Sequence, residues 1–232
     1  MAAQTPQIKL YTNPLSPWSH RAHIALDELK LPYEQEIVDI SKPRTAEYLA
    51  LNPRGLVPTM SYNGQIITES AIITTFLADT FSTTSSLLPA SSESNGPLMR
   101  ARISFFVDAY LTKVVPSFMK SQKMKNGERD SALADFVNAI VKELEPLLAD
   151  AGPFYGGSSQ LTLAEVLTGP FIVRAYLLSK HGLMPESLLS DLATKAPRFD
   201  TWAKAVIDHP SVSGGIWNEE KMAAFFRSKM GA

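Results

Sequence analysis

The sequence has 232 residues, of which 45% are hydrophobic and 19% are charged, and it contains no cysteine. A formal net charge of −1 gives no electrostatic basis for binding a nucleic acid, and no apolar run reaches the roughly 18 residues that a membrane span needs. Without cysteine there is no disulfide, no thiolate metal site and no cysteine nucleophile. The N-terminal MAAQTPQ lacks the basic and apolar regions of a secretory signal, so we expect a cytoplasmic location.

Residues 1–82 alternate between strand and helix patterns, which predicts a small α/β domain. Strands are predicted at 8–11, 33–40, 57–60 and 65–68, and helices at 18–30, 46–51 and 70–81. The opening strand–helix–strand order favours parallel pairing of the first two strands. Tyr62-Asn63-Gly64 predicts a hairpin turn between the last two, which adds an antiparallel edge to the sheet.

Residues 83–97 are rich in serine, threonine, proline and glycine, which is typical of a linker. Beyond them, residues 98–232 carry only helical patterns, which predicts an all-helical second domain. Its helices are predicted at 98–118, 128–150, 162–179, 185–195, 199–207 and 218–228. In a protein with this order of elements, ligands bind at the carboxyl ends of parallel strands. Ser16 follows one such strand end.

Ser16 has two interpretations. Serine is a preferred N-cap and proline favours the first helical position, so Ser16-Pro17 is a complete helix start. The same geometry also suits chemistry, because a helix N-terminus stabilises an anion and a hydroxyl can donate a hydrogen bond to one. A thiolate is one such anion.

Two further segments each allow a structural and a functional interpretation. Val57-Pro58 is either the start of an edge strand or a cis peptide bond that turns the Val57 main chain toward a ligand. In Thr68-Glu69-Ser70, either a hydroxyl caps the next helix and Glu69 complements its dipole, or Glu69 binds a ligand ammonium and Ser70 a carboxylate.

Three motifs in this order resemble the glutathione transferase family: SPWSHRAHIAL, NPRGLVPTM and IITESAI, followed by an all-helical half. The resemblance covers nearly the whole chain and is closest to the omega-like and serine-type classes. It implies a thioredoxin-like N-terminal domain, a helical C-terminal domain and a homodimer. It also implies glutathione as the co-substrate, with no metal.

The resemblance also implies site residues. Ser16 is expected to be catalytic, with Asn13 and Lys113 as further candidates for stabilising the thiolate. Glutathione is expected to contact Ser16, Arg44, Val57, Pro58, Glu69 and Ser70, with Lys42 as the alternative to Arg44 for the glycine carboxylate. The second-substrate pocket is expected to include Trp18, Phe106 and Tyr110. Asn13 could equally be a turn-forming residue before Pro14, and Lys113 a lysine on a solvated surface.

We therefore expect a glutathione transferase that conjugates the tripeptide to a small, largely apolar electrophile, in detoxification or in secondary metabolism. Without any cysteine, a mixed disulfide with the protein cannot form, which favours conjugation over thiol transfer. The alternatives are a glutathione-binding protein without catalysis and a glutathione-dependent isomerase or ether-cleaving enzyme.

Two other patterns are interpreted as structural. Thr162 and Glu165 have the spacing of a capping box, which marks the start of a buried helix. His20, His23 and Asp27 recur along one helix stripe that we expect to be solvated, and the sequence has no G-x-S-x-G element, so a hydrolase triad is not predicted.

Overall fold

The computed structural model describes residues 5–81, 87–185, 187–215 and 218–230. It divides into two compact units, residues 1–88 and 89–232, which are treated separately below. Residues 82–86, which contain the start of the predicted linker, lie outside the described residues, as do residues 1–4.

The first unit has the predicted order of strands and helices. Its elements are β1 (Ile8–Thr12), α1 (Pro17–Glu28), β2 (Glu34–Ile37), α2 (Ala46–Leu51), β3 (Thr59–Tyr62), β4 (Gln65–Thr68) and α3 (Ser70–Thr80). The strands form one sheet in the order β2-β1-β3-β4. The parallel β1–β2 pair and the antiparallel β3–β4 hairpin are confirmed, and β3 lies antiparallel beside β1. The first domain is therefore thioredoxin-like, as predicted.

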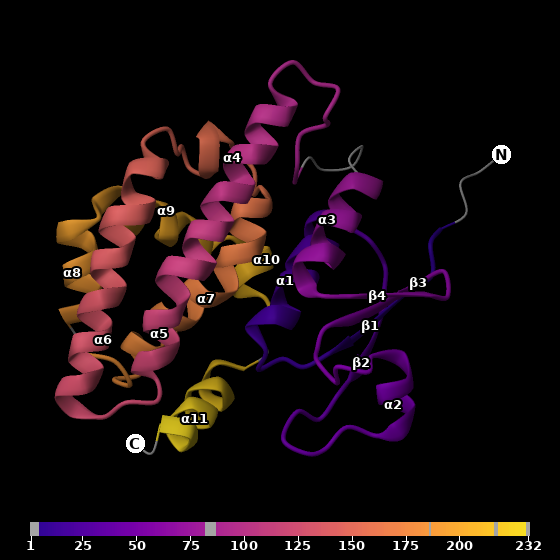
Figure 1. Cartoon of the computed structure of the whole chain (residues 1–232), viewed down its shortest axis with the longest axis horizontal. Helices are drawn as coiled ribbons and strands as arrows, with labels where there is room; N and C mark the ends of the chain where they lie inside the picture. Colours follow the sequence, from indigo (N-terminus) through magenta and orange to yellow (C-terminus); the bar gives the residue numbers. More distant parts are fainter. Residues whose placement is uncertain (1–4, 82–86, 186, 216–217, 231–232) are drawn as a thin grey trace. The chain divides into compact units, whose positions relative to one another are not determined.

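The core of the first unit lies between the sheet and the helices α1 and α3, which pack against each other (Figure 1). Leu10 and Met60 are fully buried from neighbouring strands, while Ile24 and Ile73 are fully buried from the two helices. A side chain of this size stabilises the fold by about 1.5–3 kcal/mol when it is fully buried. This packing holds the amino ends of α1 and α3 in fixed positions.

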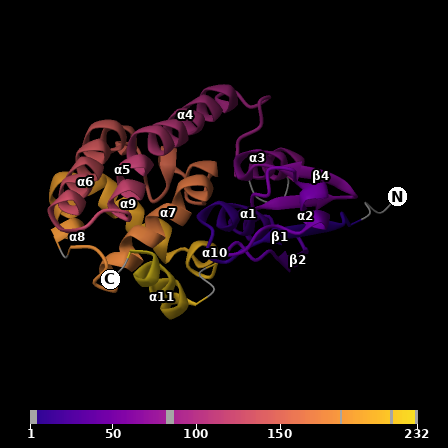
Figure 2. The ribbon, with the colours of Figure 1, turned by 60° about the horizontal axis from the view of Figure 1, so that its bottom comes forward.

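The second unit contains helices only among its described residues. They are α4 (Gly96–Ala109), a π segment (Tyr110–Val114), α5 (Val115–Ser121), α6 (Asn126–Ala139), a second π segment (Ile140–Leu144), 3₁₀ turns (Glu145–Leu148 and Tyr155–Gly157), α7 (Leu163–Lys180), α8 (Ser187–Lys195), α9 (Pro197–Asp208), α10 (Pro210–Ser213) and α11 (Glu219–Met230). Figures 1 and 2 both show α5 and α6 side by side. The short helix α10 was not predicted.

Helix α7 is the centre of the second unit and contacts α4, α8, α9, α10 and α11. Its predicted capping box is confirmed: Thr162 caps the helix, and the Glu165 carboxylate accepts from the Thr162 N–H at 2.8 Å. Glu165 is fully buried and also accepts from the Tyr155 N–H at 2.8 Å and from Trp202 Nε1 at 2.7 Å. The carboxylate thus joins three segments of the unit.

Two predicted long helices change their winding part-way along. In each, a π segment is followed two residues later by a proline, Pro116 or Pro146. Proline has no N–H and its ring clashes with the carbonyl four residues earlier, and a widened turn accommodates both. The Val115 N–H accordingly bonds to the Tyr110 carbonyl, five residues back. Residues that follow each π segment therefore lie on a different face from the one that ideal helical spacing predicts.

Among the described residues, no helix combines the length and the apolar character required to cross a membrane. The same residues hold no cluster of three or more histidine, aspartate or glutamate side chains that could bind a metal ion.

Candidate functional site

Ser16 is the N-cap of α1 and is 7% exposed. Its hydroxyl oxygen accepts from the Ser19 N–H at 3.2 Å, and the helix continues with Pro17. A serine hydroxyl has one donor and two acceptor positions, and this cap uses only an acceptor position. Among the hydrogen bonds of the described residues, none is donated by the Ser16 hydroxyl. No acidic side chain lies in the first turn of α1 to compete for its partial positive charge.

The loop between β1 and α1 is held at both ends. Asn13 donates from Nδ2 to the Val38 carbonyl at 2.9 Å, and its Oδ1 accepts from the Leu15 N–H at 3.0 Å. The Ser16 N–H donates to the Asn13 carbonyl at 3.0 Å. The Asn13 amide thus bonds to main-chain groups at both ends, which supports its turn-forming interpretation over a catalytic one.

The second part of the site is the loop before β3, which contains a cis peptide bond between Val57 and Pro58. Asn52 holds this loop: its Nδ2 donates to the Leu56 carbonyl at 3.0 Å and to Thr59 Oγ1 at 2.9 Å. β3 begins at Thr59, two residues later than predicted, because Pro58 has no N–H for the ladder.

The third part is the start of α3. Glu69 occupies the N-cap position, yet its side chain makes no capping bond, and its φ of +69° is a rarely populated conformation. Such conformations are concentrated at functional sites. The Glu69 carboxylate instead pairs with Arg54 at 2.5 Å, while Ser70 Oγ accepts from Arg21 at 3.2 Å. Arg21 is 1% exposed, and its guanidinium carbon lies 4.4 Å from the centre of the Trp18 ring. Capping by Thr68 or Ser70 is therefore the wrong interpretation.

These three parts meet at a cavity of about 270 Å³ in the first unit. It is lined by Trp18, Asn52, Leu56, Val57, Pro58, Glu69 and Ser70. Most of the residues predicted to bind the tripeptide thus lie around one cavity. Ser16 does not line it, although Trp18, in the same first turn of α1, does.

Arg44, the first choice for the glycine carboxylate, is a brace between two loops. Its guanidinium donates to the carbonyls of Gly55 at 2.9 Å, Asp39 at 2.7 Å and Lys42 at 2.5 Å. Lys42, the alternative, has a side chain that is 77% exposed, with an ion pair to Asp39 at 3.4 Å. The geometry therefore favours Lys42 over Arg44 for an exchangeable ligand.

The second-substrate assignment of Phe106 and Tyr110 needs correction, because these side chains are 0% and 2% exposed. Phe106 packs at 4.7 Å from the Tyr155 ring and at 5.2 Å from the Trp202 ring, inside the core of the helical unit. Lys113 lies in the π segment and is exposed. Its exposure supports its interpretation as a lysine on a solvated surface.

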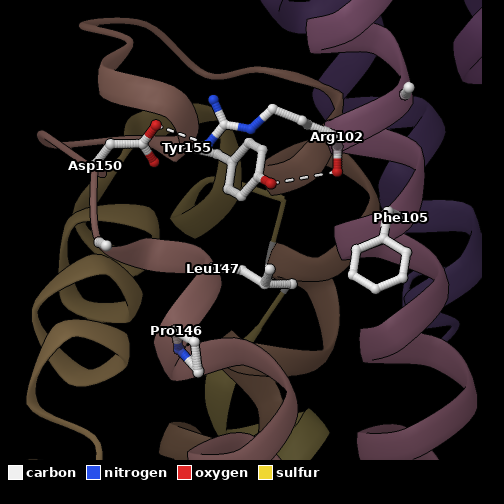
Figure 3. Close-up of a pocket in the computed structure, with 8 residues that line it drawn as sticks. Arg102, Phe105, Pro146, Leu147, Asp150 and Tyr155 are labelled. Atoms are coloured by element: carbon white, nitrogen blue, oxygen red, sulfur yellow. Dashed lines mark hydrogen bonds and ion pairs between the residues drawn. The ribbon is translucent and has the colours of Figure 1, made fainter.

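A second cavity, of about 470 Å³, lies on the surface of the helical unit and includes Phe105, which is 60% exposed (Figure 3). An ion pair of 2.7 Å joins Arg102 to Asp150 at its edge, and the Tyr155 hydroxyl donates to the Arg102 carbonyl at 3.3 Å. Its charged groups are thus already paired with each other.

The predicted solvated stripe on α1 is wrong for its histidines. His20 is 2% exposed, and His23 lies between the hydroxyls of Thr12 and Tyr33, each at 2.8 Å. Burial lowers the pKa of His23 to about 4 and raises the pKa of Tyr33 to about 12. Asp27 is the exposed member of the stripe.

The comparison with known proteins agrees with this geometry. Residues 15–80 match the family model for the glutathione S-transferase N-terminal domain. The chain is 26% identical over 213 residues to glutathione S-transferase U22 of Arabidopsis thaliana, covering 90% of each chain. It is 29% identical over 212 residues to the probable glutathione S-transferase parC of Nicotiana tabacum, covering 89% of this chain and 88% of that one.

Solved structures agree as well. A rice transferase in complex with glutathione has a TM-score of 0.84 and 25% identity over 99% of this chain and 98% of that one. Glutathione transferase Omega 2C from Trametes versicolor has a TM-score of 0.82 and 27% identity over 97% and 99%. Over nearly its whole length the chain is therefore similar to glutathione S-transferases. An omega-class transferase is thus among the structures to which the chain is similar.

Sequence reasoning missed Arg21 and Arg54, although both side chains contact predicted site residues. Arg21 is part of the first motif, and its i, i+3 spacing from Trp18 was a usable signal. Arg54 is part of the second motif, but its contact with Glu69 had no local signal, because only the fold brings these two residues together across 15 positions.

Proposed function

We propose that this chain is a glutathione transferase in which Ser16 stabilises the thiolate of bound glutathione. The observation that carries the proposal is the Ser16 hydroxyl, which caps α1 through an acceptor position and keeps its proton for donation. The cavity that includes Trp18, Val57, Glu69 and Ser70 supports the binding of the rest of the tripeptide beside it.

The energies are sufficient for this role. A free thiol with a pKa of about 8.5 is only about 3% ionised at pH 7. Lowering that pKa by about 2 units requires about 2.7 kcal/mol. A hydrogen bond to a charged group contributes about 1.5–3 kcal/mol, and the helix N-terminus adds about 0.3–1 kcal/mol. Ser16 therefore acts as a hydrogen-bond donor and does not need to lose its proton.

In the proposed complex the cysteinyl main chain pairs with Val57, beside the cis Pro58. The γ-glutamyl ammonium meets Glu69, and its carboxylate meets Ser70 at the amino end of α3. The ionised sulfur then attacks a small electrophile and releases its leaving group. Because the chain has no cysteine, no protein disulfide competes with this step.

Lys42 is proposed to bind the glycine carboxylate, because Arg44 already bridges two loops. Replacing Lys42 with alanine should weaken glutathione binding by about threefold, since exposed ion pairs contribute 0.2–1 kcal/mol. Arg44→Ala should instead reduce thermal stability. Isothermal titration with glutathione and a melting curve for each variant separate the two roles.

We also propose a homodimer and a cytoplasmic location. The dimer is supported by two large apolar side chains on α4, Leu98 at 64% and Phe105 at 60% exposure, whose seven-residue spacing places them on one face. The location is supported by chemistry, because reduced glutathione requires a reducing compartment. Light scattering after size-exclusion chromatography measures the oligomeric state.

The decisive experiment is to titrate the thiol of bound glutathione by the ultraviolet absorbance of its thiolate. A thiol pKa about 2 units below that of free glutathione is expected. If the bound thiol keeps its solution pKa, the chain is a glutathione-binding protein instead. Mass spectrometry of products from an electrophile panel then separates conjugation from isomerisation and ether cleavage.

A further inference from the structure

His23 links three segments around the loop that carries Ser16. Its Nε2 lies 2.8 Å from Thr12 Oγ1, at the end of β1, and its Nδ1 lies 2.8 Å from the Tyr33 hydroxyl, just before β2. The Tyr33 ring also packs against the imidazole, with 5.7 Å between the ring centres. A side chain from the middle of α1 is thus fixed on both of its nitrogens.

Thr12 passes this restraint to the catalytic loop. It is fully buried, and its carbonyl accepts from the Val38 N–H at 2.8 Å, so both its side chain and its main chain are held. The next residue, Asn13, accepts from the Ser16 N–H. The distance between the end of β1 and the start of α1 is therefore set by His23 on one side and by the Asn13 turn on the other.

We propose that His23 is a positioning residue, which holds the Ser16 hydroxyl in its thiolate-stabilising position through Thr12. The proposal rests on the function proposed above for Ser16. A neutral imidazole has one donor and one acceptor nitrogen, which matches two hydroxyl partners, since either hydroxyl can take either role. Burial keeps His23 neutral, and the titratable groups near it include its partner Tyr33 and Asp27, which is exposed. A shift of the loop by about 1 Å is enough to cost about a hundredfold in rate.

Substitutions of His23 can separate the role of Nε2, which contacts Thr12, from that of Nδ1, which contacts Tyr33. Glutamine places its amide nitrogen where Nε2 lies and can still reach Thr12, whereas asparagine reaches only as far as Nδ1, on the Tyr33 side. We expect kcat to fall about tenfold in His23→Asn and His23→Phe, with the KM for glutathione changed less than twofold, and to recover to within about threefold in His23→Gln. Thr12→Val should match His23→Phe, and the double variant should be no worse than either one.

Tyr33→Phe is the matched control for stability, because it removes the other partner of the same ring. His181→Phe is the control for substitution itself, because His181 belongs to the helical unit, where it pairs with Glu219. Both controls should leave the pKa of the bound thiol unchanged. Equal effects of Tyr33→Phe and Thr12→Val on that pKa would overturn the assignment.

A measurement without glutathione tests the inference independently of the proposed function. The Ser19 N–H donates to Ser16 Oγ, so its hydrogen exchange reports on the cap. We expect exchange about tenfold faster in His23→Phe and near the native rate in His23→Gln. Unchanged Ser19 exchange in His23→Phe refutes the inference, whereas a wild-type chain that shows no thiolate refutes the proposed function.

Discussion

Among the described residues, the hydroxyls of Ser16, Thr45 and Thr162 each cap the start of a helix. The hydroxyls of Ser16 and Thr162 differ in the hydrogen-bonding capacity that remains after capping. Thr162 accepts from the Ala164 N–H at 3.1 Å and donates to the Glu165 carboxylate at 2.7 Å, deep in the helical unit. Ser16 accepts from the Ser19 N–H at 3.2 Å, and its hydroxyl donates no hydrogen bond to any of the described residues.

The difference shows how one local rule serves two purposes. Both caps satisfy main-chain donors at a helix start, which stabilises the helix by about 1 kcal/mol. Thr162 is followed by Glu165, whose carboxylate accepts a hydrogen bond from the Thr162 hydroxyl and completes the capping box. Ser16 is followed by Pro17, Trp18 and Ser19, none of which has a carboxylate that could accept a hydrogen bond from its hydroxyl. We therefore expect substitutions of Ser16 to change catalysis, and substitutions in the Thr162–Glu165 box to change stability.

Ser16 should show the largest effect. Ser16→Ala should lower turnover by about 10²–10³-fold, as the loss of one oxyanion-hole donor does, with glutathione binding mostly retained. Ser16→Gly should lower turnover equally while keeping most of the cap stability, since glycine is a tolerated N-cap. Steady-state kinetics and melting curves measure both effects. Turnover that survives in either variant would transfer the thiolate role to another donor.

In the helical unit, Glu165→Gln should have the largest effect, and it should lower the free energy of unfolding. One oxygen of the native carboxylate accepts from Tyr155 and Trp202, and the other accepts from Thr162. The amide of glutamine has only one oxygen, so its NH₂ group would face one of these two sets of donors. We expect a loss of about 2–4 kcal/mol in the free energy of unfolding. Denaturant unfolding measures it, and turnover per folded molecule should stay at the native value. A selective loss of turnover would contradict the structural role of this box.

Acid should destabilise the chain through His23. Its pKa is about 4 in the folded chain against 6.5 in the unfolded chain, so the unfolded chain binds the extra proton between these values. This proton uptake has almost no effect on stability above pH 6.5 and lowers the free energy of unfolding by about 3 kcal/mol at pH 4. Unfolding free energies at pH 7 and pH 4.5 should therefore differ less in His23→Phe than in the native chain. A parallel pH dependence would show that His23 is not buried in its neutral form.

Glu69 provides a further helix start, which lacks a side-chain cap altogether. Glu69→Gln should weaken glutathione binding by about tenfold, because a charge-assisted bond of about 1.5–3 kcal/mol becomes a neutral one. Stability should change by less than about 0.5 kcal/mol, since its ion pair with Arg54 is exposed. Calorimetric titration measures the affinity, and an unchanged value would remove Glu69 from the site.

Sequence reasoning succeeded where the signals are local. The Asn63-Gly64 turn and the Thr162–Glu165 box located a hairpin turn and a helix cap at their observed positions. It failed for Phe106, because the rings of Tyr155 and Trp202 that bury it come from distant parts of the chain. The hydrogen bonds of Arg44 to Asp39 and Gly55 could not be predicted either, because loop folding brings these residues together.

The sequence by itself determined the order of elements, the caps and the motifs of the family, because hydrophobic period, proline and hydroxyl placement act over a few residues. Only the tertiary structure decided which polar groups were left available. It buried His20, placed His23 between two hydroxyls, bonded the Arg44 guanidinium to carbonyls, and grouped Val57, Glu69 and Trp18 around one cavity. The physical reason is that a hydrogen-bonding group is consumed or exposed by whatever packs against it, and those neighbours come from distant parts of the chain.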